Sequence, residues 1–115
     1  MNRNITEFQM KNVSAPEISQ VVVNNICNLL TVQVYGSFSA AQIFVEGMTA
    51  VGSGQWQKIA VVDKNLNEPV TGTDGITSAG IYQAAIEGLK NVRVNIASVT
   101  GTVNVDAVFS AASDN

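Results

Sequence analysis

The side chains that most often carry catalysis are scarce in this 115-residue sequence, which contains no histidine and one cysteine. Histidine is the usual proton carrier near neutral pH and the commonest metal ligand. Cys27 therefore has no imidazole to activate it and is interpreted as an inert thiol. A glycosidase-like pair of carboxylates would have to be assembled by the fold alone, because the nine acids are spread singly along the chain: Glu7, Glu17, Glu46, Asp63, Glu68, Asp74, Glu87, Asp106 and Asp114. We expect no enzyme activity, no catalytic residue and no cofactor.

One oxygen-rich stretch, residues 63–68 with the sequence DKNLNE, resembles the start of a calcium-binding loop. An EF-hand loop needs glycine at its sixth position and glutamate at its twelfth. This chain has Glu68 and Asp74 at those positions. We therefore interpret the stretch as a solvated loop that ends at Pro69, and we expect no metal site.

Aromatic side chains could bind sugars, because exposed flat rings stack on sugar faces. Tyr82 alternates with Ala84 and Ile86, which predicts that its ring lies on the buried face of a strand. Trp56 is the glycan-stacking candidate of an alternative hypothesis, in which the protein is a carbohydrate-binding adhesin module. Exposure of the Trp56 ring distinguishes this alternative from simple core packing.

The composition predicts an all-β protein. Val (17), Ile (9) and Thr (8) are abundant, and such β-branched side chains suit strands better than helices. Charged residues make up 13% of the chain and the net charge is −3, so we expect no nucleic-acid partner. No long apolar run is present, which argues against a membrane partner, and the first 18 residues carry no apolar segment typical of a secretion signal.

Short runs of alternating polarity predict about eight antiparallel strands. Residues 92–110 are predicted to form a β-hairpin that turns at Thr100-Gly101, and Gly36–Ser39 is predicted to be another turn between strands. Further strands are expected at residues 19–24, 30–35, 42–46, 55–62 and 80–87, with a weaker one at 70–73. The predicted architecture is a two-sheet β-sandwich of jelly-roll or Ig-like Greek-key type.

The first 18 residues differ from the rest of the chain, because their apolar positions follow no lasting period and Pro16 closes the segment in an extended conformation. We expect residues 1–18 to form an extended arm or edge strand, residues 19–111 to form the sandwich and residues 112–115 to form a tail. The apolar side chains of the arm are the predicted partner-docking residues: Ile5, Phe8, Met10 and Val13.

Residues 30–111 resemble small β-sandwich virion proteins of tailed bacteriophages, of the head decoration, head fibre and tail-associated kinds. The resemblance rests on short motifs in a fixed order. They are residues 32–38 (VQVYGSF), 44–47 (FVEG), 55–59 (QWQKI), 80–82 (GIY), 88–89 (GL) with 92–94 (VRV), and 100–105 (TGTVNV).

This resemblance implies a non-enzymatic capsid decoration or head-associated protein that is assembled in the host cytoplasm and resides in the virion. A tail, baseplate or neck accessory protein is the alternative within the same class. The implied partners are the major capsid protein or neck and tail proteins, together with further copies of the chain in a homo-oligomer, such as a trimer, or in a multicopy array. The arm is expected to bridge to a neighbouring subunit by adding a strand to a sheet edge.

Overall fold

A computed structural model of the chain describes residues 6–24, 27–49 and 54–111, and within these ranges the protein is all-β, as predicted. No described segment is a helix long and apolar enough to cross a membrane. The described residues form nine strands in one sheet: β1 (Thr6–Val13), β2 (Glu17–Ile18), β3 (Val22–Val23), β4 (Leu29–Met48), β5 (Gln57–Ile59), β6 (Val62–Asp63), β7 (Glu68–Pro69), β8 (Gly80–Ala85) and β9 (Asn91–Ser110).

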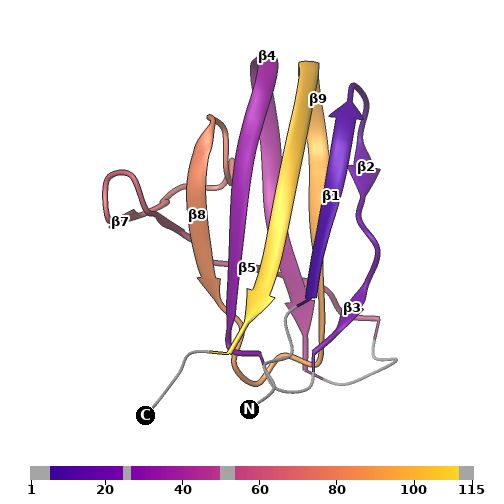
Figure 1. The fold of residues 1–115 in the computed structure, drawn as a ribbon, viewed down its shortest axis with the longest axis vertical. Helices are drawn as coiled ribbons and strands as arrows, with labels where there is room; N and C mark the ends of the chain where they lie inside the picture. The colour runs from indigo at the N-terminus through magenta and orange to yellow at the C-terminus, as the bar shows by residue number, and fades with distance from the viewer. Residues whose placement is uncertain (1–5, 25–26, 50–53, 112–115) are drawn as a thin grey trace.

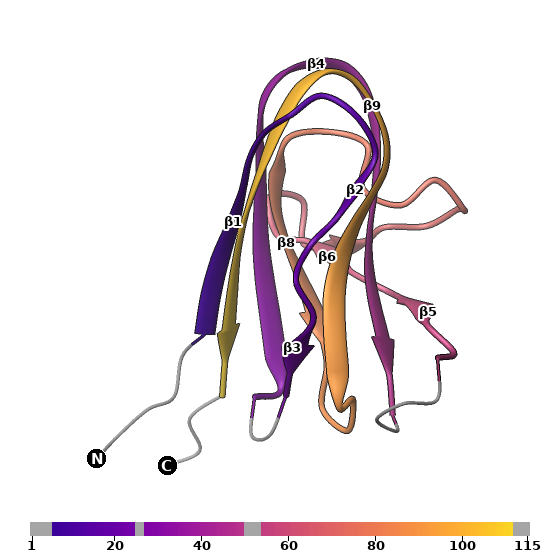
Figure 2. The ribbon, with the colours of Figure 1, turned by 90° about the vertical axis from the view of Figure 1, so that its right-hand side faces the viewer.

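Two strands of 20 residues, β4 and β9, form the centre of the sheet. They pair antiparallel from Leu29 opposite Ser110 to Met48 opposite Asn91. Both strands bend over at the same end of the molecule, so that the two halves of each strand face one another (Figures 1 and 2). The single sheet is therefore folded into two facing layers, and β4 and β9 run through both of them.

The predicted hairpin at residues 92–110 is wrong. Val94 pairs with Val45 and Val105 pairs with Val34, so both halves of this segment pair with β4 and not with each other. Gly36–Ser39 likewise lies within β4 instead of joining two strands. The mistake has a simple cause, because two halves of a bent strand bury alternate residues just as the two arms of a hairpin do.

Glycines allow the paired bend in β4 and β9. Gly36 lies opposite Val103, and Gly101 lies opposite Phe38. Both have positive φ, of 134° and 109°, and a Cβ on either would lie 2.5 Å from a carbonyl oxygen of the opposite strand. The register shifts between Phe38 and Ala40 and between Gln42 and Ile43, as expected of bulges that bend a strand.

The N-terminal segment follows the bend of β9. β1 pairs with the second half of β9, for example Phe8 opposite Ala107, whereas β2 and β3 pair with its first half. Figure 2 shows this segment rising through β1, passing over the bend and descending through β2 and β3. Residues 6–13 are thus an edge strand of the chain's own sheet. Residues 1–5 and the predicted tail at 112–115 lie outside the described residues.

The remaining strands extend the sheet beyond β4. The order is β1-β9-β4-β8-β6-β7, and β5 pairs with the second half of β4. The hydrogen bonds therefore give one open sheet in place of two separate sheets. Residues 70–73, the weaker strand prediction, form no strand, and Ile76 makes an isolated bridge with Ile43 instead.

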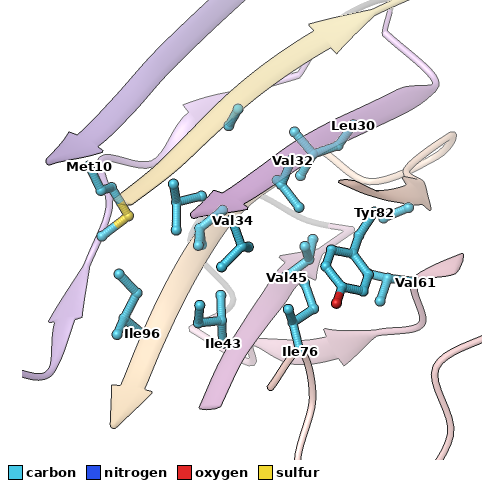
Figure 3. Close-up of a cluster of buried hydrophobic side chains, with 14 of the residues drawn as sticks. Met10, Leu30, Val32, Val34, Ile43, Val45, Val61, Ile76, Tyr82 and Ile96 are labelled. Atoms are coloured by element: carbon cyan, nitrogen blue, oxygen red, sulfur yellow. The ribbon is translucent and has the colours of Figure 1, made fainter. Parts of the chain in front are cut away.

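The hydrophobic core lies between the two halves of the folded sheet, where side chains from β1, β4, β8 and β9 meet (Figure 3). Each predicted alternation places its apolar members inward, as in Leu30, Val32 and Val34. Tyr82 is 3% exposed, and its hydroxyl donates a hydrogen bond to the carbonyl of Ser78 at 2.9 Å. The inward orientation predicted for Tyr82 is confirmed.

We predict that Gly101→Ala destabilises the protein by about 3 kcal/mol or more, because backbone strain of about 1–3 kcal/mol is added to a steric clash at the bend. Gly88→Ala is the matched control, since Gly88 also has positive φ (89°) but a Cβ there meets nothing within 4 Å. We expect Gly88→Ala to be destabilised only by the backbone strain, because no steric clash is added. Urea unfolding measures the free energy of unfolding of both variants. Equal losses of stability would show that the close approach of the strands at Gly101 does not exclude a side chain.

Candidate interaction surface

A buried charge lies at the centre of the outer face formed by β5, β4 and β9. The side chains of Ile43 and Val45 point into the core, so Glu46 of the same strand points outward. Glu46 stands opposite Lys58 of β5 and Arg93 of β9. Although it is on the outer face, Glu46 is only 7% exposed, so its carboxylate needs polar partners.

Both oxygens of this carboxylate are satisfied. Arg93 Nε donates to Glu46 Oε1 at 2.8 Å, which is also an ion pair. Asn95 Nδ2 donates to Glu46 Oε2 at 3.0 Å. Hydrogen bonds to ionised groups are shorter and stronger than neutral ones. The Asn95 contact therefore holds the Glu46 carboxylate, and the carboxylate in turn holds the Arg93 side chain.

The fixed Arg93 side chain supports Trp56. Its guanidinium carbon lies 4.0 Å from the centroid of the Trp56 ring, a cation–π contact that also packs the indole against the sheet. On the same face, Lys58 Nζ lies 4.0 Å from the centroid of the Phe44 ring. We call this set of side chains the outer cluster: Phe44, Glu46, Trp56, Lys58, Arg93 and Asn95.

The outer cluster bears directly on the glycan-stacking hypothesis for Trp56. The side chain is half-buried, and Arg93 already covers one face of its ring. Stacking of a sugar would therefore have to use the other face. The cluster contains an ion pair and two cation–π contacts, an arrangement that stabilises a surface and that places no nucleophile beside a base.

The other outer face, formed by β1, β9 and β4, carries a smaller polar chain. Lys11 Nζ donates to the Tyr35 hydroxyl at 2.9 Å, and this hydroxyl donates to Asp106 Oδ1 at 3.1 Å. The hydrogen bond to Tyr35 raises the pKa of Lys11, with a smaller contribution from the Asp106 charge. These contacts tie β1 to the two central strands.

The free edge of the sheet at β2 and β3 is unusually apolar. Both strands pair with β9 on one side, and no other described strand pairs with them. Ile18, Val21 and Val23 are 50%, 47% and 59% exposed. We call residues Glu17–Val23 the β2–β3 edge. Open strand edges with apolar side chains are templates for pairing with another chain.

The structure does not bring the predicted docking residues to this surface. Phe8, Met10 and Val13 are 9%, 4% and 3% exposed, and the Phe8 ring packs against Phe109 with a centroid distance of 6.1 Å. They stabilise the chain's own core and are not available to a partner in this structure. Ile5 lies outside the described residues.

A local sequence signal for the exposed edge lies in three consecutive valines. Alternation through Val21, Val22 and Val23 places one valine inward and two outward, and Val22 is indeed the buried one at 8% exposure. Ile18 is a further apolar residue of this edge and is the last residue of the predicted arm.

The oxygen-rich stretch at residues 63–68 begins at the end of β6 and ends at the start of β7. In the loop from β6 to β7, Asp63 Oδ1 accepts the backbone N–H groups of Asn65 and Leu66 at 2.9 and 3.3 Å, as a turn-forming aspartate does. Cys27 is half-buried. Over the described parts of the chain, no group of three or more His, Cys, Asp or Glu side chains could hold a metal ion.

Comparisons with known proteins agree on one fold. A family model, XepA, matches residues 4–108. The structure is similar to the SPBc2 prophage-derived protein YomS, with a TM-score of 0.79 and 21% identity over 95% of each chain. It is also similar to the PBSX exported protein XepA, with a TM-score of 0.80 and 23% identity over 95% of this chain but only 38% of XepA. A search of curated proteins found no match.

We predict that Arg93→Ala lowers the free energy of unfolding by about 1.5–3 kcal/mol, because it leaves the nearly buried Glu46 carboxylate without its cation. It also uncovers Trp56, so the fluorescence emission of this single tryptophan shifts to the red. Arg93→Lys keeps the charge but loses the planar stack, and we expect an intermediate result. Unchanged emission in Arg93→Ala would show that Arg93 does not hold the indole.

Proposed function

Because the chain belongs to the XepA family, we propose that it is a non-enzymatic structural protein of a tailed bacteriophage, a capsid decoration or head-associated protein that docks on the particle. The support is of two kinds. Two solved structures with this fold, YomS and XepA, are of proteins from the prophages SPBc2 and PBSX. The described surface also offers a contact feature, the β2–β3 edge.

The β2–β3 edge is the observation that carries the proposal. Proteins protect such edges with short strands, lysines, prolines or bulges. Here β2 and β3 are short, with two residues each, but residues 17–23 contain a single charge, Glu17, and three exposed apolar side chains. An extended strand of a neighbouring virion protein can pair with its backbone and cover Ile18, Val21 and Val23. This contact differs from the one expected from the sequence, because Phe8, Met10 and Val13 of the arm are buried in the chain's own core.

Particle docking by such an edge depends on repetition. A single short strand gives a modest contact, but many copies in a fixed array raise the effective concentration and hence the overall affinity. The proposal therefore includes a homo-oligomer or multicopy array, with protein partners and without a nucleic-acid or membrane partner. A tail, baseplate or neck position uses the same contact at a different place in the particle.

A role outside the particle is the second candidate function. It is favoured by the description of the PBSX protein XepA as exported. The carbohydrate-binding alternative requires sugar at the face of Trp56 that Arg93 leaves uncovered. These candidates differ in where the protein is found and in what protects Trp56.

We predict that Val23→Lys reduces incorporation into particles at least tenfold, because it removes about 1.5–3 kcal/mol of apolar burial and places a charge in the contact. Leu66→Lys is the matched control, since Leu66 is 66% exposed on the loop between β6 and β7, away from this edge. Particles purified by density gradient from each variant are assayed for the protein by mass spectrometry.

Two results would contradict the proposal. Equal incorporation of wild type and Val23→Lys would show that the β2–β3 edge is not the contact. Wild-type protein absent from purified particles and present in the medium would reject virion docking in favour of an exported role. Quenching of Trp56 fluorescence that is relieved by sugars, without particle binding, would favour the adhesin.

A further inference from the structure

A hollow opens where the chain leaves β4 and later returns to it. β5 pairs with β4 as far as Ile59 opposite Val45. The chain then departs and comes back at Ile76, whose backbone exchanges hydrogen bonds with Ile43 at 3.0 and 2.8 Å. Figure 3 shows Ile43 and Ile76 near Val45, with the Tyr82 ring between them and Val61. Between the departing and returning segments lies an open hollow of about 340 Å³.

The lining of this hollow is mainly apolar and is held in place by the fold. Val61 and Val70 form one wall, fixed by the hydrogen bond from Val70 N–H to the Val61 carbonyl at 2.9 Å. Phe44 forms another part of the lining. A Cβ on Gly75 would lie 2.6 Å from the Phe44 ring, so glycine at this position lets the loop pack directly on the ring and fix it.

A single cation stands among the described lining residues. Lys58 is exposed, and its ammonium lies over the Phe44 ring. The ion pair found among the described residues joins Arg93 to Glu46, so Lys58 has no described carboxylate within ion-pair distance. Asp74 is next to the lining residues Thr73 and Gly75 in sequence, but its Oδ1 accepts a hydrogen bond from Gln42 Nε2 at 3.2 Å.

We propose that this hollow binds a carboxylate that carries a short apolar group. The carboxylate pairs with Lys58 Nζ, and the apolar group packs against Phe44, Val61 and Val70. Small-ligand sites commonly combine a mostly apolar lining with a few polar groups that fix orientation, and this hollow has that form. Two sources share the chemistry, namely the free C-terminus of a peptide that ends in an apolar residue and a small aliphatic acid. The site is independent of particle docking through the β2–β3 edge.

The test is an NMR titration of the full-length, ¹⁵N-labelled protein with octanoate, using octanamide as the neutral probe of similar size. We expect octanoate to shift the amide signals of residues 58–61 and 70–75, and octanamide to bind at least fivefold more weakly. Lys58→Gln should weaken octanoate binding by about fivefold, whereas Lys64→Gln, the same charge change on an exposed residue outside the lining, should leave it unchanged.

A second variant fills the hollow without touching the core. Ala60 is an exposed lining residue, so Ala60→Phe should abolish octanoate binding while keeping a dispersed spectrum and the wild-type Tm. Thr73→Trp, also at an exposed lining position, serves the same purpose if Ala60→Phe does not fold.

A pair of peptides distinguishes the sources. Ala-Ala-Leu with a free carboxylate is compared with its amide and with octanoate. Tighter binding of the free peptide identifies a chain end as the ligand, and tighter binding of octanoate identifies an aliphatic acid. The proposal is overturned if octanamide binds as well as octanoate, if Lys58→Gln has no effect, or if the shifted signals lie away from the hollow.

Discussion

The structure depends on one backbone constraint, which is that two paired strands of 20 residues must bend at the same place. A bend in one strand alone would break the antiparallel ladder. Gly36 and Gly101 allow it in both, because each takes a positive φ and leaves no room for a side chain against the opposite strand. The register shifts between Phe38 and Ala40 and between Gln42 and Ile43 compensate for the different lengths of the two strands' paths around the bend. Once β4 and β9 are bent, the segment paired with β9 must follow it, and the apolar faces of the two halves enclose the core.

The bend also determines where the few charged side chains of this chain meet one another. Side chains alternate between the core and the outer face, so cross-strand neighbours on the outside come from distant parts of the sequence. Glu46 lies opposite Lys58 and Arg93 in the strand register in this way, and its ion pair with Arg93 then holds the guanidinium against the Trp56 ring. The outer cluster is thus a product of strand register. The adjoining hollow exists because β5 stops pairing with β4 at Ile59, opposite Val45, and the chain returns to β4 only at Ile76, opposite Ile43.

Inward faces were predictable from the sequence, whereas the path of the chain was not. Alternation correctly placed Leu30, Val32, Val34 and Tyr82 in the core. It could not show whether a glycine ends a strand or bends it, and so β9 was mistaken for a hairpin. The irregular spacing of Met10 and Val13 comes from the register shift between them, where Asn12 has a φ of 54°. This bulge accounts for the absence of a lasting period in a segment predicted to be an extended arm or an edge strand, and residues 6–13 form an edge strand.

The candidate site was predictable only in part, because its contacts join residues far apart in the sequence. Trp56 was identified as a candidate, but the residue that supports it, Arg93, was not, since no local pattern links the two. The same fold occurs nearly alone in YomS, 95% of which is covered, and as 38% of the longer XepA chain. A fold that serves in both settings does not by itself specify a function. Evidence for function in this chain is therefore sought in its own surface, where the β2–β3 edge and the hollow beside Lys58 are two features that the other described strands leave open.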